Sequence, residues 1–84
     1  MAKVEVEVKD KKLLKIEEVS ALLNISDPTL RKIIKAGYLP VLRLGRNILI
    51  YTYELDEFCK RMMDKELDLS TMKVSDIDYS EIGA

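Results

Sequence analysis

The junction at residues 24–28 constrains the fold of this chain most, because it ends one helix and starts another with almost no room between them. Asn24 suits the left-handed backbone conformation that ends a helix. Ser26 and Asp27 can each cap the next helix, and Pro28 fits its first turn, where a missing N–H costs nothing. The sequence therefore predicts two helices joined by a turn of about three residues.

Helical spacing defines both of these helices. The first is expected over residues 16–23, where acidic residues occupy the first turn, near the positive end of the helix dipole. The second is expected over residues 26–36. Its apolar side chains at i, i+3 and i+4 spacing are Leu30, Ile33 and Ile34. Arg31, Lys32 and Lys35 point the other way, so the outer face of the second helix is predicted to be basic.

Two runs rich in strand-forming residues follow Gly37, which stands where a helix commonly ends. Residues 39–44 and 47–51 flank Gly45 and Arg46, which predicts a hairpin with an arginine at its tip. Two helices joined by a short turn, with such a hairpin beside them, form a helix-turn-helix with a wing. The predicted fold class is therefore α+β, a small winged helix-turn-helix.

The last helix of the domain is expected to begin at Thr52, which can cap it, and to end near residues 63–67. The residues of its predicted buried stripe are Leu55, Phe58, Cys59 and Met62. In that stripe Cys59 is expected to act as a small hydrophobe and not as a reactive thiol. One cysteine and no histidine exclude Cys/His zinc clusters and Ser-His-Asp or Cys-His nucleophile systems, so neither enzymatic activity nor a cofactor is expected.

The two ends of the chain are expected to lie outside a domain of residues 13–67. In residues 1–12, Val4, Val6 and Val8 alternate with charged residues, which predicts an extra N-terminal edge strand followed by a charged connector. Residues 68–84 show no strong periodicity and are predicted to form an acidic, disordered tail. The alternatives for this tail are contact with a protein partner and competition with DNA for the basic face.

The net charge of −1 hides a division along the chain. Residues 1–63 carry 12 lysines and arginines against 9 acidic residues, whereas residues 64–84 carry 2 against 6. A basic domain can attract a polyanion if its charges share one face. The longest apolar run, Ile48 to Tyr51, is far shorter than the roughly 20 residues of a membrane span, and no signal peptide precedes it, so a cytoplasmic protein without a membrane partner is expected.

Several segments carry a resemblance to a known family. Leu14–Ser26 and Thr29–Pro40 match its two helices, and the match continues through Arg43–Ile50 and Glu54–Phe58. Over Leu13–Met62 the chain resembles the excisionase-type, MerR-like winged helix-turn-helix. The resemblance implies binding of duplex DNA through the second helix and the wing. The family that the chain resembles includes recombination directionality factors of phages and integrative elements, and small transcription regulators.

The candidate DNA-contacting residues lie in the second helix and the hairpin. They are Ser26, Asp27, Thr29, Arg31, Lys32, Lys35, Arg43, Arg46 and Asn47. Residues 26–36 are expected to enter the major groove, and the hairpin to lie along the backbone or the minor groove. The alternative for the basic residues is a solvated helix face, and Thr29 could merely support the start of the helix.

Within the DNA-binding class, an excisionase-like architectural factor is predicted, because the chain has little beyond the domain. A stand-alone transcription regulator is the first alternative. A protein-interaction module that grips another protein through the basic helix is an alternative from a different class. The expected partners are double-stranded DNA, an integrase or recombinase, and further copies bound cooperatively on DNA. No small-molecule substrate is expected, and no coiled coil follows Met63 to form a MerR-type dimer.

Overall fold

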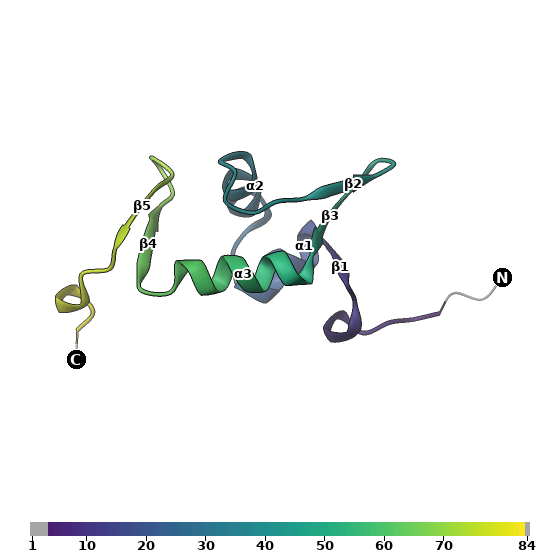
Figure 1. Cartoon of the computed structure of the whole chain (residues 1–84), viewed down its shortest axis with the longest axis horizontal. Helices are drawn as coiled ribbons and strands as arrows, with labels where there is room; N and C mark the ends of the chain where they lie inside the picture. Colours follow the sequence, from purple (N-terminus) through teal and green to yellow (C-terminus); the bar gives the residue numbers. More distant parts are fainter. Residues whose placement is uncertain (1–3, 84) are drawn as a thin grey trace.

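The computed structural model describes residues 4–83, and Figure 1 shows the path of the chain. The helices and strands are β1 (Leu13–Lys15), α1 (Ile16–Leu23), α2 (Asp27–Lys35), β2 (Leu42–Leu44), β3 (Asn47–Tyr51), α3 (Thr52–Met62), β4 (Lys65–Asp68) and β5 (Lys73–Asp76). Two short 3-10 helices, η1 (Val8–Asp10) and η2 (Tyr79–Glu81), lie towards the ends. This α+β arrangement is the predicted winged helix-turn-helix, with the β2–β3 hairpin as its wing.

The junction between α1 and α2 has the geometry that its residues predict. Asn24 adopts the left-handed conformation, with φ of 59°, and the Ile25 N–H donates to the Ser20 carbonyl at 3.0 Å, which closes the end of α1. Ser26 is the N-cap of α2, and its Oγ accepts from the Thr29 N–H at 3.3 Å. Local capping therefore fixes where each helix stops and starts.

A three-stranded antiparallel sheet in the order β1-β3-β2 supports the two helices. The central strand pairs Ile50 with Leu14 of β1 and Ile48 with Arg43 of β2. Gly45 has a φ of 63°, which suits glycine at the tip of a two-residue hairpin turn. The wing strand β2 begins later than predicted, at Leu42, and Leu39 lies before it, buried in the core.

The core lies between the helices and the inner face of this sheet. Its buried residues are Leu14, Ile16, Val19, Leu30, Ile33, Leu39, Ile50, Leu55 and Phe58. The one polar residue among them, Ser20, donates its hydroxyl to the Ile16 carbonyl at 3.0 Å. Every element from β1 to α3 contributes to the core except β2, and α2 contributes Leu30 and Ile33 from its apolar face.

The predicted N-terminal edge strand is not formed in its described part, residues 4–8; residues 1–3 lie outside the described chain. Val4 is 87% exposed and pairs with no strand, and the chain instead turns through η1. The alternating pattern identified a segment able to form a strand, but a strand also needs a partner edge. The adjacent β1 offers only three residues, and these pair with β3.

Two expectations for α3 are also corrected. Cys59 is exposed, so it does not belong to the buried stripe with Leu55 and Phe58. Only one narrow side of α3 is covered by the core, and Cys59 falls beside it. The helix ends at Met62, because Met63 is extended and Asp64 has a positive φ of 66°.

The acidic C-terminal segment is not an irregular tail, because β4 and β5 form an antiparallel hairpin that rises from the end of α3 (Figure 1). Its turn is closed by the Asp68 carboxylate, which accepts from the N–H groups of Ser70 and Thr71 at 2.8 and 3.3 Å. The Tyr38 hydroxyl, just beyond α2, donates to the Met72 carbonyl at 2.6 Å. The hairpin is therefore tied to the helix-turn-helix.

Candidate nucleic-acid interface

The outward face of α2 is basic and fully open to solvent. Arg31, Lys32 and Lys35 are exposed, whereas Leu30 and Ile33 on the opposite side are buried. This division follows from the helical repeat, which places apolar residues at i and i+3 towards the sheet. The buried side fixes the position of α2, and the exposed side remains available to a partner.

Between α2 and the wing lie two adjoining hollows, which we call the α2–wing groove. One is lined by Lys15, Ile16, Glu17, Arg31, Arg46, Asn47 and Ile48. The other is lined by Ile16, Arg31, Ile34, Lys35, Arg43 and Ile48. Both hollows share Arg31, and Ile16 and Ile48 form their common apolar floor. The groove thus brings together five of the predicted contact residues, from two elements that are separated along the chain.

The basic side chains at this surface are uncompensated. Among residues 4–83, no ion pair involves Arg31, Lys32, Lys35, Arg43 or Arg46. Glu17 is the one acidic residue that lines the groove. Guanidinium and ammonium groups without a protein carboxylate are free to bind phosphate oxygens, which is the main source of affinity for duplex DNA.

Three predicted contact residues lie at the start of α2, where they also shape the helix. The Ser26 hydroxyl donates to the Thr29 hydroxyl at 2.9 Å, so part of the hydrogen-bonding capacity of these two groups is used within the helix cap. Asp27 is exposed in the first turn, where the positive end of the helix dipole favours its carboxylate. Lys32 is exposed on α2 but does not line the groove.

Lys15 is a groove residue that the sequence reasoning missed. It is the last residue of β1 and the N-cap of α1, and its place beside Arg46 and Asn47 depends on the pairing of β1 with β3. The available signal was its position before the first helix of a helix-turn-helix, since that helix crosses the DNA backbone in such domains.

The neighbouring Glu18 stabilises α1 and takes no part in the groove. Its carboxylate accepts from the Lys15 N–H at 2.9 Å and pairs with the Lys11 ammonium at 2.7 Å. The Lys11 hydrogen bond and the Lys15 N–H hold the pKa of Glu18 below its ordinary value. This carboxylate therefore caps the first turn of α1, in agreement with a structural role for the acidic residues there.

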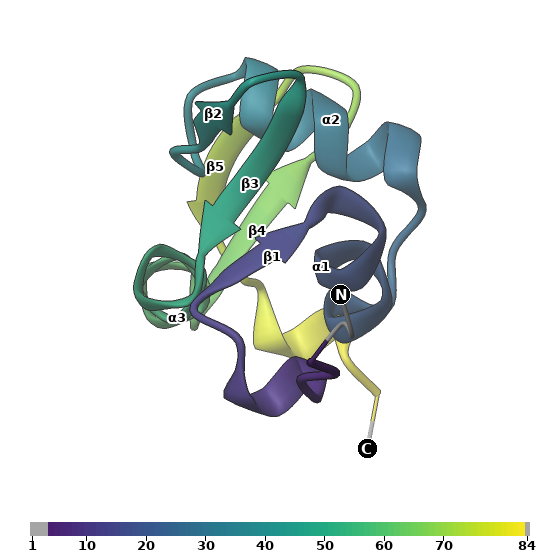
Figure 2. The same ribbon diagram turned by 90° about the vertical axis from the view of Figure 1, so that its right-hand side faces the viewer.

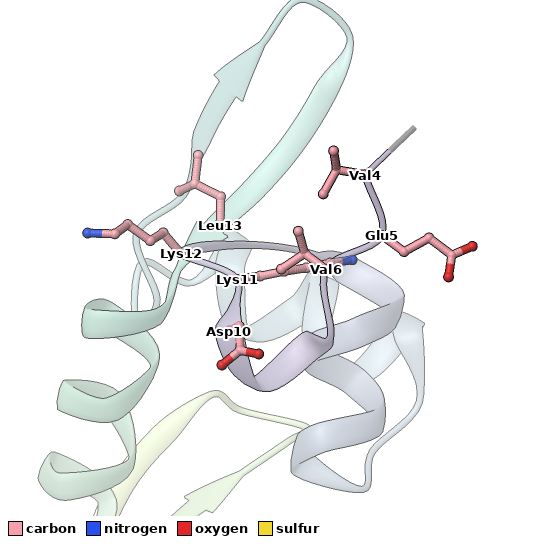
Figure 3. A pocket seen from close by; sticks show the side chains of 7 residues that line it. All are labelled: Val4, Glu5, Val6, Asp10, Lys11, Lys12 and Leu13. Carbon is pink, nitrogen blue, oxygen red and sulfur yellow. The ribbon is translucent and has the colours of Figure 1, made fainter. Parts of the chain in front are cut away.

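A further hollow lies at the N-terminal segment, among Val4, Glu5, Val6, Asp10, Lys11, Lys12 and Leu13 (Figure 3). Its charged side chains do not converge, since Glu5 and Lys12 point to opposite sides. A binding site needs convergent polar groups, so this hollow has no recognisable chemistry.

Comparison with known protein families finds one family that covers the helix-turn-helix and the wing. A family model described as a helix-turn-helix domain matches residues 13–63, which run from β1 through α3. No match was found among curated proteins or among solved structures. No helix within residues 4–83 is long and apolar enough to cross a membrane.

The matched family is consistent with the excisionase-type resemblance of the sequence, and its domains place one helix in the major groove of DNA and are not typically enzymes. The match covers more than half of the chain, and its span contains α2, the wing and the α2–wing groove. The chain belongs to the helix-turn-helix domain family, which supports a role in binding double-stranded DNA.

Proposed function

We propose that the protein inserts residues 26–36 into the major groove of duplex DNA and lays the wing along the adjacent backbone or minor groove. The observation that carries the proposal is the α2–wing groove, where basic side chains of two elements stand exposed and form no ion pair within residues 4–83. Arg31 lies at the centre of this surface, because it lines both hollows.

The side chains divide by chemistry into positioning and base-reading groups. Lys32, Lys35, Arg43 and Arg46 suit phosphate oxygens, which position the domain on the duplex. Arg31 can bind a guanine edge through its guanidinium, and Asn47 can bind an adenine edge through its amide. The remaining contacts are at the start of α2: Ser26 and Thr29 to phosphate, and Asp27 to a cytosine amino group.

Within this class we propose an excisionase-like architectural factor whose copies bind side by side. One domain makes few base contacts, and each contributes only about 1 to 3 kcal/mol of discrimination, so neighbouring copies add specificity. The outer face of the sheet supports such contacts, because Leu42, Leu44 and Tyr51 are exposed there on the side away from the core. Curvature of the DNA by adjacent copies would assist assembly of an integrase complex.

The first experiment measures DNA binding by fluorescence anisotropy with the full chain at several salt concentrations. We expect Arg31→Ala and Lys35→Ala to weaken binding without changing the melting temperature, since both side chains are exposed. Lys9→Ala is the matched control, because Lys9 is exposed in η1, outside the groove. Equal affinities for all three variants would exclude α2 as the DNA-binding helix.

The second experiment tests the architectural role by footprinting and circular-permutation mobility on DNA that flanks the encoding gene. Protection of direct repeats together with bending supports an excisionase-like factor. Protection of a single inverted repeat at a promoter, without bending, supports a transcription regulator instead. Binding of another protein through α2, with no affinity for duplex DNA, would replace both with an interaction module.

A further inference from the structure

The helix α2 is flanked by two hairpins and not by the wing alone. In Figure 1 the β2–β3 wing lies on one side of α2 and the β4–β5 hairpin on the other, and both tips lie at the top of the view. Figure 2, turned by 90°, also shows α2 and both tips at the same end of the molecule. We propose that the tip of the β4–β5 hairpin is a second arm that contacts the sugar–phosphate backbone of the duplex bound by α2; this inference rests on the proposed function.

Hydrogen bonds fix the position of this tip relative to α2. The Tyr38 hydroxyl donates to the Met72 carbonyl at 2.6 Å, and Arg61 of α3 donates to the Tyr38 carbonyl at 3.0 Å. The Tyr38 N–H itself donates to the carbonyl of Ile33 in α2 at 3.3 Å. Met72 also packs against the hydrophobic core. The tip is therefore held beside the end of α2, which limits the entropy lost on binding.

The tip carries groups that suit phosphate oxygens. Asp68 and Lys73 face each other across the ladder, yet no ion pair joins them in the described chain, and Oδ1 of Asp68 instead accepts from the turn at Ser70 and Thr71. The Lys73 ammonium has no ion-pair partner among residues 4–83. The exposed Thr71 hydroxyl, which accepts from the Lys73 N–H at 3.4 Å, is a second group at the tip that can contact a phosphate. Ammonium and hydroxyl groups make most protein contacts to the DNA backbone.

Charge is distributed along the hairpin in a way that permits this contact. At the base, Lys65 pairs with Asp76 at 2.5 Å, and the further acidic residues Asp64 and Asp78 lie beyond the ends of the two strands. At the tip, Asp68 and Lys73 lie opposite each other in the ladder, so their formal charges sum to zero although no ion pair joins them in the described chain. Four of the six acidic residues of the C-terminal segment, Asp64, Asp76, Asp78 and Glu81, thus lie at the base of the hairpin or beyond it, whereas Glu66 lies within β4.

The test compares Lys73→Ala with Lys9→Ala in the full chain by anisotropy with a duplex over a range of salt. The two variants lose the same charge, but Lys9 lies in η1, far from both tips in Figure 1. One lost phosphate contact should reduce the slope of log K against log salt by about 0.9, which corresponds to binding about eightfold weaker at 0.1 M salt. Thr71→Ala should weaken binding without changing the slope.

The outcomes separate this inference from the proposed function. If wild type binds with a steep salt dependence but Lys73→Ala matches Lys9→Ala, or binds more tightly, the second arm is overturned and the proposed function stands. If wild type shows no salt-dependent binding to duplex DNA, both are overturned together. Melting curves of each variant confirm that a loss of affinity does not come from unfolding.

Discussion

Removal of one hydroxyl group tests whether the C-terminal hairpin belongs to the folded domain. Tyr38→Phe keeps the half-buried ring and the backbone bonds of Tyr38 but deletes the donor to the Met72 carbonyl, 2.6 Å away. A hydrogen bond of this kind contributes about 0.5 to 1.5 kcal/mol to stability. Because a two-stranded hairpin is marginally stable alone, we expect this loss to appear as local opening of β4 and β5.

The size of the effect follows from that free energy. A loss of about 0.5 to 1.5 kcal/mol raises the opening equilibrium about 2- to 13-fold, so the amide hydrogens of residues 65–68 and 73–76 should exchange faster by that factor. Exchange in α1 and α2 should stay unchanged. The control is Tyr53→Phe, because Tyr53 is 57% exposed and its hydroxyl makes no hydrogen bond within the described residues.

The result that would refute this reasoning is equal exchange of the hairpin amides in the two variants. Amides of β4 and β5 that lack protection even in the wild-type chain would refute it more strongly. That result would favour the disordered tail expected from the sequence over a folded hairpin.

Three further substitutions test the helix-turn-helix by thermal or denaturant unfolding. Leu30→Ala should lower the free energy of unfolding by about 2 to 5 kcal/mol, because Leu30 is fully buried. Leu22→Ala, at a position that is 56% exposed, should lower it far less. Similar unfolding midpoints for the two variants would contradict the packing of α2. The Glu18 carboxylate should contribute stability that is present at neutral pH and is lost as the pH falls through its lowered pKa, and Glu18→Gln should remove this contribution. If the free energies of unfolding of variant and wild type differ by the same amount at all pH values, the Lys11 pair is excluded as the source of that stability. Asn24→Ala should be about 1 kcal/mol less stable than Asn24→Gly, since alanine is disfavoured at a φ of 59°.

Where local chemistry determines the structure, the sequence predicted it closely. The junction between α1 and α2 depends on capping by Asn24 and Ser26, which are within a few residues of the bonds that they make. The basic face of α2 depends only on helical spacing. For the same reason the hairpin tip at Gly45 could be predicted from two residues.

Where distant contacts determine the structure, the sequence carried little signal. The three residues of β1 become a strand only through pairing with β3, and that pairing brings Lys15 to the groove. The β4–β5 turn contains no glycine, and Met72 takes the positive φ of 58° instead. The hydrogen bond from Tyr38 that anchors this turn joins residues 34 positions apart, beyond the reach of local patterns.

The central claim is that the exposed basic residues of α2 and the wing bind the phosphates of duplex DNA, and the salt dependence of binding measures this most directly. A domain of this size that neutralises about 4 to 6 phosphates should give a slope of log K against log salt of about −3.6 to −5.4. Combining Lys35→Ala with Arg46→Ala should make that slope shallower by about 1.8 if each side chain contacts one phosphate. A wild-type slope near zero, or a slope that the double substitution leaves unchanged, would contradict the account.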